Sequence, residues 1–498
     1  MQPSSGILGI LVAIVLSGGC SEPARTASRH HSTSETLDRP GSPPRDAYET
    51  FDVVWNTVDR QHFDPDHNGV DWDEVRTTYR PRIEDTRSQA DVRALLSEMI
   101  GELDQSHFVI VAASGTSSPR GSEDVPSESD EEIDGDVSTD DASAIDEEDD
   151  DIVLSAEGYT GIRLDFEGDD IVVAHVERGS SAAEAGVRPG LQVVSIDGIN
   201  PNSRFLSIRS AAEEDGSHMA NYYLYAGMNA MASGRPGQRK TFEFLDEDGE
   251  AVDIEVEVES KTGDTTDFMQ MGPMTTKFSS HVLTGDELRS LGLRIDGPDA
   301  PRILLITFDN WMFPIMGPLR ATMDEHRDVD GVIIDLRGNP GGAGGLAMGV
   351  AGFFFDEPLS LGDMKMREST MHFRVNPQKV TLDGRIVEPF AKPVAIVVDN
   401  GSASTSEIFA GGMQKLGRAT VVGRRTAGAA LPAHLMRLPN GDRFMYAVAD
   451  FLDPDGNTIE GVGVTPDRDV RIDRQLLARR GDPDLAIAAE VILADTPN

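Results

Sequence analysis

The spacing of apolar residues changes several times along the chain. From Asp46 to about Val111, apolar positions recur at the three- and four-residue spacing of amphipathic helices, in YETFDVVWNTVDRQHF, WDEVRTTYRPRI and VRALLSEMIGEL. This spacing predicts a small helical unit over residues 45–113, which ends in LDQSHFVIV, where a strand begins. Residues 154–260 instead read as short alternating strands, among them DIVVAHV, KTFEFLD and AVDIEVEVE.

Residues 261–498 alternate apolar runs with helical stretches. RILLITF, VDGVIIDL and PVAIVVD are short and rich in Val and Ile, and each is followed by glycine or a turn and then by a helical pattern. Parallel strands that are buried on both faces have this composition. The expected fold class is therefore multidomain α/β and α+β, with a helical unit, a β domain and an α/β core.

Length and charge limit what the chain can bind. Its 498 residues, 39% of them hydrophobic, suffice for three or four domains. The formal net charge of −42 argues against nucleic acid, because that partner requires a positive face. Residues 121–152 hold sixteen Asp or Glu and no Lys or Arg, which predicts a disordered acidic insert over 114–153. The insert has no EF-hand spacing, so a solvated spacer is favoured over a calcium site.

An apolar run of ten residues, Ile7 to Leu16, stands near the N-terminus. It is short for a membrane-spanning helix but suits a signal peptide, expected over residues 1–20. The single cysteine, Cys20, follows three small residues, an arrangement that resembles a bacterial lipoprotein signal in which Cys20 becomes lipidated and anchors the protein to a membrane. The alternative is an ordinary cleaved signal. Both predict export to the periplasm or cell envelope, and residues 21–44 predict a flexible tether.

The β domain shows a recognisable order of elements. In SSAAEAGVRPGLQVVSIDG a short helix, a glycine-rich turn and a strand ending in Asp-Gly follow one another, and this order resembles a PDZ domain. The resemblance implies a peptide that adds as a strand to a sheet edge while loop N–H groups hold its terminal carboxylate. That loop would be Tyr159, Thr160, Gly161 and Ile162. About twenty-five residues from Phe205 to Met231 look like an insertion, which predicts an altered or covered groove.

A serine cluster follows the apolar run PVAIVVD, at an expected junction between a strand and a helix. In DNGSASTSEIFAGGM the helical pattern begins after Ser404, where the N–H groups of a helix N-terminus could stabilise an oxyanion. The spacing from Ser404 to Glu407 is also that of a capping box, which the local pattern alone favours. A glycine-rich turn, LRGNPGGAGG, follows Asp335 and could supply further N–H donors. It lacks the GK[ST] of a Walker phosphate loop.

Together these motifs indicate a family. DLRGNPGG, SASTSEIFAGG and GRATVVGRRTAGA resemble the serine peptidase family that contains the C-terminal processing peptidases and the tricorn core proteases. The resemblance covers residues 46–470, with helical unit, PDZ-like domain and core in the family's order. It implies a crotonase- or ClpP-like core and cleavage of polypeptides by acyl transfer to serine, with no metal and no other cofactor.

Two branches of that family differ in the base that activates the serine. The processing peptidases use a lysine, but the corresponding residue of GRRTAGAA is Ala429. The tricorn-type branch uses a Ser-His pair from the helical unit, to which LDQSHFVIV is similar. By this resemblance Ser404 is the nucleophile and His107 the general base, a task that suits a neutral imidazole. Ser106 would orient the imidazole, and Glu460, in NTIEGVGVTPD, would support that relay.

Other residues compete for these roles. A histidine after a helix is often only structural, and His434 is closer in sequence to Ser404, although it falls in the predicted strand LPAHLMRL. Lys415 lies eleven residues along the helix and is too distant to reach the hydroxyl easily. His62 and His67 could hold a metal, yet HFDPDHNG lacks a recognised ligand spacing, and a polar turn is favoured.

The function expected from the sequence is an exported serine endopeptidase. N–H groups of Thr405 and Gly341 would hold the oxyanion, and the PDZ-like domain would hold or gate a polypeptide by its free carboxyl end. Arg424 and Arg425 could attract that carboxylate, although a solvated basic pair is simpler. Two alternatives stay open. The first is an inactive ligand- or peptide-binding member of the same fold, which the missing lysine supports. The second is a PDZ scaffold at a membrane surface.

Overall fold

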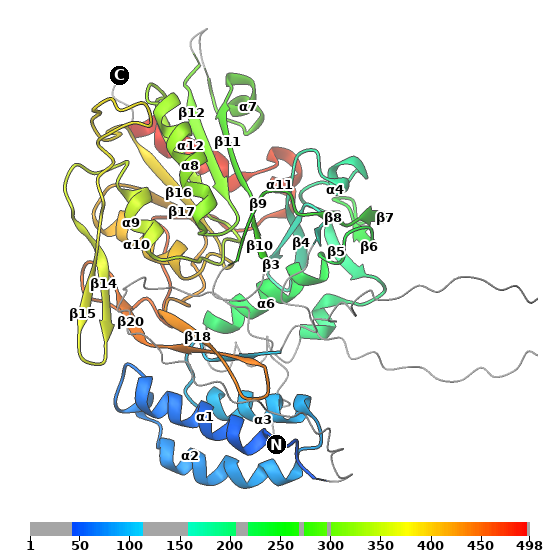
Figure 1. Cartoon of the computed structure of the whole chain (residues 1–498). Coiled ribbons are helices and arrows are strands. Elements are labelled where there is room, and N and C mark those ends of the chain that lie inside the picture. Colours follow the sequence, from blue (N-terminus) through cyan, green and yellow to red (C-terminus); the bar gives the residue numbers. More distant parts are fainter. Residues whose placement is uncertain (1–41, 113–157, 206–217, 268–272, 296–299, 496–498) are drawn as a thin grey trace, which may run out of the picture.

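The structure is a computed structural model that describes residues 42–112, 158–205, 218–267, 273–295 and 300–495. The expected signal peptide with Cys20, nearly all of the tether and the acidic insert lie outside these residues. Figure 1 shows a multidomain α/β molecule in which the helical unit lies below an α/β core and the β domain lies to the right of that core. None of the helices in the described parts of the chain combines the length and the apolar composition of a membrane-spanning segment.

The helical unit packs three helices against each other and against the core. Its elements are α1 (Ala47–Gln61), η1 (His67–Gly69), α2 (Trp72–Tyr79), η2 (Arg80–Asp85) and α3 (Gln89–Gly101). Helix α3 begins at a capping box between Ser88 and Asp91. The apolar sides of the helices share one hydrophobic cluster with Leu431 and Phe444 from the C-terminal half of the chain. This shared cluster attaches the unit firmly to the core.

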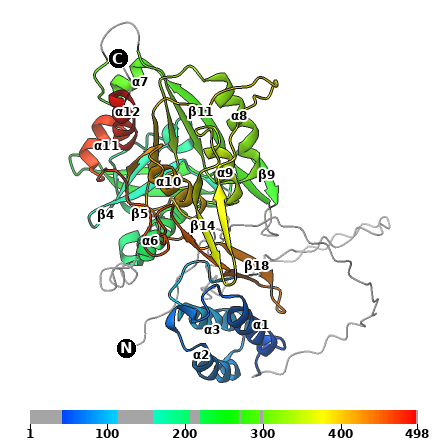
Figure 2. The same ribbon diagram turned by 90° about the vertical axis from the view of Figure 1, so that its left-hand side faces the viewer.

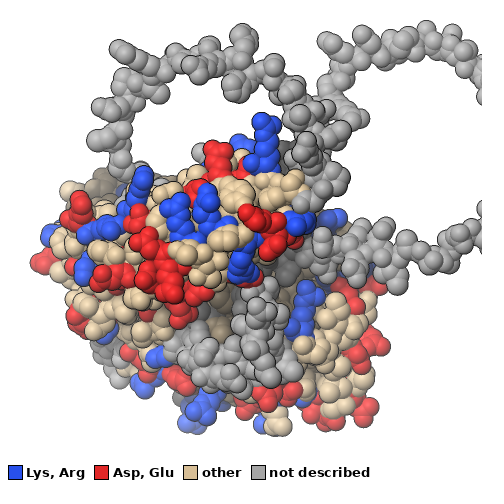
Figure 3. All heavy atoms as spheres, turned by 90° about the horizontal axis from the view of Figure 1, so that it is seen from below, with Lys and Arg blue, Asp and Glu red and all other residues tan. Residues whose placement is uncertain are grey.

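Charged side chains of both signs cover the outer face of the helical unit. Figure 3 views the molecule from this end and shows Lys and Arg interspersed with Asp and Glu. Some of them form ion pairs, such as Arg76 with Asp52 at 2.9 Å and Arg82 with Glu98 at 2.6 Å. This face therefore carries no field of a single sign, in spite of the large net charge of the chain.

The β domain is an antiparallel sheet with helices at its side. The strands of its main sheet follow the order β3-β4-β5-β6-β7, and a short pair, β2 with β8, adjoins it. The elements are β2 (Gly158–Tyr159), β3 (Ile162–Glu167), β4 (Asp170–Val176), α4 (Ser181–Glu184), β5 (Gln192–Ile196), α6 (His218–Met231), β6 (Arg239–Leu245), β7 (Ala251–Glu257) and β8 (Glu259–Ser260).

The core contains a sheet of the order β11-β12-β13-β16-β17-β21, in which β11 is antiparallel and the other neighbours pair in parallel. Every residue of β13 and β16 is buried, as expected for strands covered on both faces. The strands are β11 (Phe278–Leu283), β12 (Ile303–Phe308), β13 (Gly331–Asp335), β16 (Val394–Val398), β17 (Thr420–Gly423) and β21 (Arg468–Asp469).

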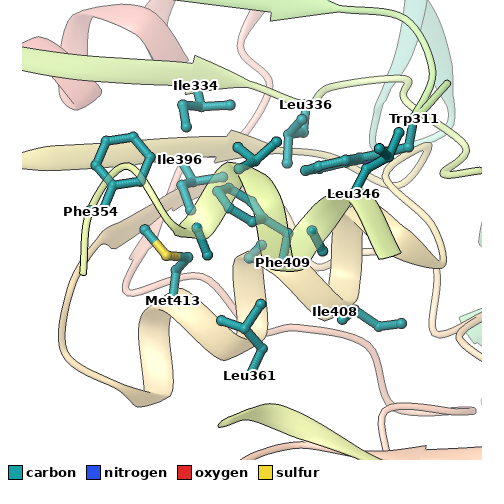
Figure 4. Close-up of a cluster of buried hydrophobic side chains, with 14 of the residues drawn as sticks. Trp311, Ile334, Leu336, Leu346, Phe354, Leu361, Ile396, Ile408, Phe409 and Met413 are labelled. Carbon is teal, nitrogen blue, oxygen red and sulfur yellow. The ribbon is translucent and has the colours of Figure 1, made fainter. Parts of the chain in front are cut away.

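Helices cover both faces of this sheet (Figure 2). Alternate strand residues point to opposite sides, so Ile334 and Ile396 pack against α8, α9 and α10, whereas Ile333 and Val397 pack against α7 and α12. Figure 4 shows the first of these clusters, with Phe409 of α10 at its centre. The helices are α7 (Gly285–Ser290), α8 (Met316–Glu325), α9 (Gly345–Ala351), α10 (Thr405–Lys415), α11 (Arg474–Arg480) and α12 (Pro483–Asp495), with η3 (Phe313–Ile315) before α8.

Smaller sheets complete the core, and one of them joins it to the helical unit. Strand β1 pairs with β19, which pairs with β18, while β14 lies between β15 and β20, and β9 pairs with β10. The strands are β1 (Val109–Val111), β18 (Ala433–Arg437), β19 (Arg443–Ala447), β14 (Ser360–Met366), β15 (Thr370–Arg374), β20 (Ala449–Leu452), β9 (Asp264–Asp267) and β10 (Pro273–Thr276). The β1–β19 pairing brings the end of the helical unit, with Ser106 and His107, to the core.

Candidate active site

Ser404 stands between strand β16 and helix α10. Its φ of 53° lies in a region that residues other than glycine rarely adopt, and the residue is fully buried. Its N–H donates to the Ala429 carbonyl at 2.9 Å and to Glu407 Oε2 at 3.0 Å. The second contact belongs to the capping box that the sequence allowed. Ser404 Oγ itself has no hydrogen-bond partner among the described residues, so the hydroxyl is not committed to the cap.

The buried Glu407 carboxylate ties this serine to the segment 426–429. Oε1 accepts from Thr426 Oγ1 at 2.5 Å and from Gly428 N at 2.7 Å, and Oε2 accepts from Ala429 N at 3.0 Å as well as from Ser404 N. Burial raises the pKa of Glu407 to about 7, although these four hydrogen bonds favour the ionised form. The sequence indicated Glu407 only as a cap; the structure adds that it fixes the backbone on both sides of the candidate site.

A second buried carboxylate lies beside the Ser106–His107 pair. Ser106 Oγ is 2.7 Å from His107 Nδ1 and donates to Glu460 Oε2 at 2.8 Å, and Ser106 N donates to Glu460 Oε1 at 2.7 Å. Burial raises the pKa of Glu460 to about 7, with the bonds from Ser106 and Ala430 acting in the opposite direction. His107 has a φ of 61° and is 7% exposed. Three of the four predicted site residues are thus in direct contact.

Two neighbouring alanines connect this trio to Ser404. Ala430 N donates to Glu460 Oε2 at 2.9 Å, while the carbonyl of Ala429 accepts from Ser404 N. Residues that are 354 positions apart in sequence, Ser106 and Glu460, therefore belong to the same hydrogen-bonded network as Ser404. Ala429, where the processing branch would carry lysine, is 3% exposed and occupied in this network by its backbone.

The glycine-rich turn after β13 lies against the N-terminus of α10. Thr405 Oγ1 donates to the Gly342 carbonyl at 3.0 Å, and Asn339 O accepts from Ser406 Oγ at 3.0 Å. Gly341, expected as an oxyanion donor, gives its N–H to Asn339 Oδ1 at 2.9 Å. In this conformation the Gly341 N–H is therefore already engaged, and its role as an oxyanion donor stays a prediction.

The competing bases lie elsewhere. Lys415, at the far end of α10, pairs with Asp453 at 3.5 Å and Asp455 at 2.9 Å. His434 is exposed on β18, where its ring meets that of Tyr446 at 6.0 Å. Among the described residues, the hydrogen-bond partners of Ser404 include neither of these side chains.

Two further candidates have contacts of their own. His62 and His67 lie in a turn, and among the described residues no group of three or more His, Cys, Asp or Glu is placed to hold a metal ion. The Arg424 guanidinium, only 12% exposed, pairs with Asp165 and Asp484, each at 2.9 Å. Arg424 is thus a buried ion-pair residue and not a solvated one, because two carboxylates already neutralise it.

The loop expected to hold a peptide carboxylate is tightly packed. Thr160 Oγ1 donates to the Ala232 carbonyl at 2.9 Å, and Ile162 N faces Thr160 Oγ1 at 3.4 Å. Gly161 has a φ of 84°, and its carbonyl accepts from Glu177 N at 2.8 Å. The Tyr159 hydroxyl accepts from Lys277 Nζ at 3.1 Å.

Helix α6 occupies the sheet edge where a peptide would add. Strand β3 is the outermost strand of its sheet within the described residues, and Asn229 of α6 bonds both Leu164 N, at 2.9 Å, and Leu164 O, at 3.1 Å. An added strand would need these same two groups. The sequence predicted an altered or covered groove here, and at Leu164 the edge is covered.

The same helix also reaches the candidate active site. The Tyr222 ring packs against Ala403, Ala427 and Ala429, which flank Ser404 in sequence or in space. Tyr222 is 3% exposed, its hydroxyl has no hydrogen-bond partner among the described residues, and burial raises its pKa. Sequence patterns gave no signal for this contact, because nothing in α6 itself specifies what it packs against.

Family models match two parts of the chain. Residues 303–470 match the model of peptidase family S41, and residues 43–101 match that of the tricorn protease C1 domain. Residues 303–470 therefore carry the likeness to peptidase family S41. The family predicted from the sequence is thereby confirmed. Ser404 and Glu460 lie inside the matched S41 segment, and Ser106 and His107 follow closely after the matched C1 segment.

Proteins with assigned names are similar to this chain over part of their length. Carboxyl-terminal-processing peptidase 3, chloroplastic, of Arabidopsis thaliana is 27% identical over 300 residues, which are 60% of this chain and 50% of that protein. The carboxyl-terminal-processing protease of Synechocystis sp. is 26% identical over 293 residues, 58% of this chain and 56% of that protein. The chain thus spans about half the length of these relatives.

Solved structures share the fold. The photosystem II D1 C-terminal processing protease superimposes with a TM-score of 0.52 at 18% identity, over 91% of this chain and 98% of that one. Mature CPAF gives a TM-score of 0.52 at 13% identity over the same shares. At these identities the likeness establishes the mixed α/β multidomain fold.

Proposed function

We propose that the protein is an exported serine endopeptidase that cleaves polypeptides by acyl transfer to Ser404, with His107 as general base. The observation that carries the proposal is the buried contact series from Glu460 through Ser106 to His107, joined to Ser404 by Ala429 and Ala430. Serine needs a neighbouring proton acceptor, and that acceptor needs a third group that fixes its tautomer.

The direction of these hydrogen bonds supports the role of His107. A serine hydroxyl has one proton, and Ser106 donates it to Glu460, so its lone pair is left for an N–H at His107 Nδ1. His107 Nε2 then carries no proton and can take that of Ser404. Three donors, Ser106 N, Ser106 Oγ and Ala430 N, converge on Glu460, which suits its ionised form.

The oxyanion of the tetrahedral intermediate would be held by the N–H groups of Thr405 and Gly341. Thr405 opens α10, where the helix dipole favours negative charge. Gly341 would have to exchange its bond to Asn339 Oδ1 for one to the oxyanion. Loss of one such donor costs on the order of 10² to 10³ in turnover in other serine hydrolases.

The β domain would engage the substrate by its free carboxyl end, at the loop from Tyr159 to Ile162. Because Asn229 bonds the sheet edge and Tyr222 packs beside Ser404, we propose that α6 shifts when a polypeptide binds. Export, and anchoring through a lipidated Cys20, are further parts of this proposal and rest on the N-terminal sequence.

Covalent labelling tests the assignment. A serine-directed fluorophosphonate should modify the wild type at Ser404 and leave Ser404→Ala unmodified, and mass mapping should detect peptides released from an unfolded polypeptide only by the wild type. His107→Ala should reduce both activities to a small residual rate, whereas His434→Ala should keep them. An unlabelled, inactive wild type would instead favour the peptide-binding alternative, and activity that depends on His434 would refute His107 as the base.

A further inference from the structure

The turn of residues 62–69, HFDPDHNG, raised the possibility of a metal site but has no part in the chemistry so far. It follows directly on α1, whose last turn is capped by the bond from His62 N to the Val58 carbonyl at 3.0 Å. Asp64 closes the turn by accepting from Asp66 N at 3.0 Å and Asn68 N at 2.9 Å. The turn is therefore a well-bonded extension of a helix that is anchored in the hydrophobic cluster shared with the core.

This turn contacts the chain on both sides of Ser106 and His107. His62 Nε2 lies 2.8 Å from Gln105 Oε1, directly before that pair. The His62 ring stacks on Phe108, directly after it, with centroids 5.4 Å apart and planes at 12°. The Asn68 side-chain amide donates to the Leu103 carbonyl at 2.9 Å.

The segment held in this way has an unusual backbone. Asp104 has a φ of 48° and His107 a φ of 61°, and residues other than glycine keep such values only where their surroundings impose them. Glu460 holds the segment at Ser106, on the core side. On the helical-unit side, the contacts to Gln105 and Phe108 come from His62.

We propose that His62 is a positioning residue that holds His107 in place for proton transfer. The proposal rests on the proposed function, because it assigns no role to His62 apart from His107. His62 Nδ1 lies 2.9 Å from the Asp64 carbonyl oxygen and 3.1 Å from Asp64 N, and Nε2 lies 2.8 Å from Gln105 Oε1, so both ring nitrogens are held by polar groups. His62 is fully buried, and burial lowers its pKa, which keeps the ring neutral. Full burial also means that His62 acts through the segment it touches and not on a substrate.

The test uses a variant that removes the hydrogen bond and keeps the ring. His62→Phe retains a planar side chain for Phe108 but leaves Gln105 without its hydrogen-bond partner, and Gln105→Met removes the other side chain of the same bond. Tyr79→Phe is the matched control, since it deletes a hydrogen bond in the same helical unit, to Glu102 at 2.6 Å, and neither partner belongs to residues 104–108. The readout is the rate of Ser404 labelling by a fluorophosphonate, with kcat and KM for a peptide substrate.

We expect His62→Phe to lower the labelling rate and kcat by about tenfold to a hundredfold, with KM within about twofold, because small misplacements of a catalytic group have effects of this size. Gln105→Met should act in the same direction, and Tyr79→Phe should match the wild type. In a His107→Ala background, His62→Phe should cause no further loss, since both act through one imidazole.

Three results would overturn the proposal, and they differ from failure of the proposed function. If His62→Phe is labelled as fast as Tyr79→Phe, His62 does not position His107. The same conclusion follows if His62→Phe lowers the labelling rate by the same factor in the His107→Ala background as in the wild type. Neither result contradicts the proposed serine peptidase activity. If His62→Phe does not fold, wild-type labelling of Gln105→Met refutes the positioning role. A wild type that is neither labelled at Ser404 nor able to cleave a polypeptide refutes the proposed function, and the role of His62 with it.

Discussion

At the scale of single residues, the candidate site depends on two buried carboxylates that lie on either side of one backbone segment. Glu407 accepts from Gly428 N and Ala429 N, and Glu460 accepts from Ala430 N, so three successive N–H groups are held by negative charge. Each carboxyl has a pKa raised to about 7 by burial. Protonation of either group removes an acceptor, which links the geometry of the site to pH near neutrality.

The activity should therefore fall on the acid side of neutrality. Ionised Glu460 accepts the Ser106 proton, but protonated Glu460 can donate instead and reverse the tautomer of His107. We expect kcat/KM to decline as the pH drops through about 7, and Glu460→Gln to lower it by at least about tenfold with a flatter acid limb. Steady-state kinetics from pH 5 to 9 would measure this. An acid limb that is unchanged in Glu460→Gln would contradict the assignment.

Stability should respond to pH in the opposite direction. The pKa of Glu407 is raised from 4.5 to about 7 in the folded state, so the folded protein binds this proton more tightly than the unfolded chain. Glu407 contributes on the order of 1 to 3 kcal/mol to the free energy of unfolding. This contribution is fully present below about pH 4.5 and is lost as the pH rises through about 7. Urea unfolding at pH 5 and 7 should show this difference in the wild type and a smaller one in Glu407→Gln. If the wild type and Glu407→Gln show the same difference in free energy of unfolding between pH 5 and 7, Glu407 is not the cause of this pH dependence.

At the scale of elements, patterns along the sequence predicted what lies within each segment. RILLITF, VDGVIIDL and PVAIVVD contain β12, β13 and β16, and the serine cluster does stand between a strand and a helix. Periodicity reports which side of an element is apolar, but not which distant element covers it. For that reason the contact of Tyr222 near Ser404 and the burial of Arg424 against Asp165 could not be predicted from sequence patterns. The same holds for the contacts of His62 with Gln105 and Phe108, on either side of the Ser-His pair.

The contact of α6 with the candidate site makes a prediction at this scale. Tyr222→Ala removes the ring that packs on Ala403, Ala427 and Ala429, and should open the approach to Ser404. We expect fluorophosphonate labelling to become several-fold faster, while loss of the buried ring lowers stability by about 3 to 5 kcal/mol.

Tyr222→Phe is the control for that experiment. The ring stays in place and only a hydroxyl without a hydrogen-bond partner among the described residues is lost, so labelling should match the wild type and stability should not decrease. Labelling rates together with urea unfolding would distinguish the variants. If Tyr222→Ala and the wild type are labelled equally fast, α6 does not limit access to the serine.

At the scale of the whole molecule, the two outer domains are attached to the core in different ways. The helical unit shares a hydrophobic cluster with residues such as Leu431 and Phe444, which makes it an integral part of the core. The β domain also relies on polar contacts, among them Tyr225 with Asp399 at 2.9 Å and the buried pair of Asp165 with Arg424. Interfaces of the second kind permit domain motion more readily than a continuous apolar core does.

This difference predicts which part of the molecule loosens first. Asp165→Asn keeps the shape of the side chain but leaves Arg424 with Asp484 as its remaining carboxylate, which should weaken the docking of the β domain by about 3 kcal/mol. Hydrogen–deuterium exchange should then accelerate in β3 and α6, while β1, β18 and β19 keep their protection, because their attachment does not involve this ion pair. Arg76→Gln, which breaks a half-exposed pair with Asp52 in the helical unit, should change neither region appreciably. If exchange becomes faster in β3, α6, β1, β18 and β19 alike, the helical unit, the β domain and the core unfold as one cooperative unit. The β domain would then have no independent motion.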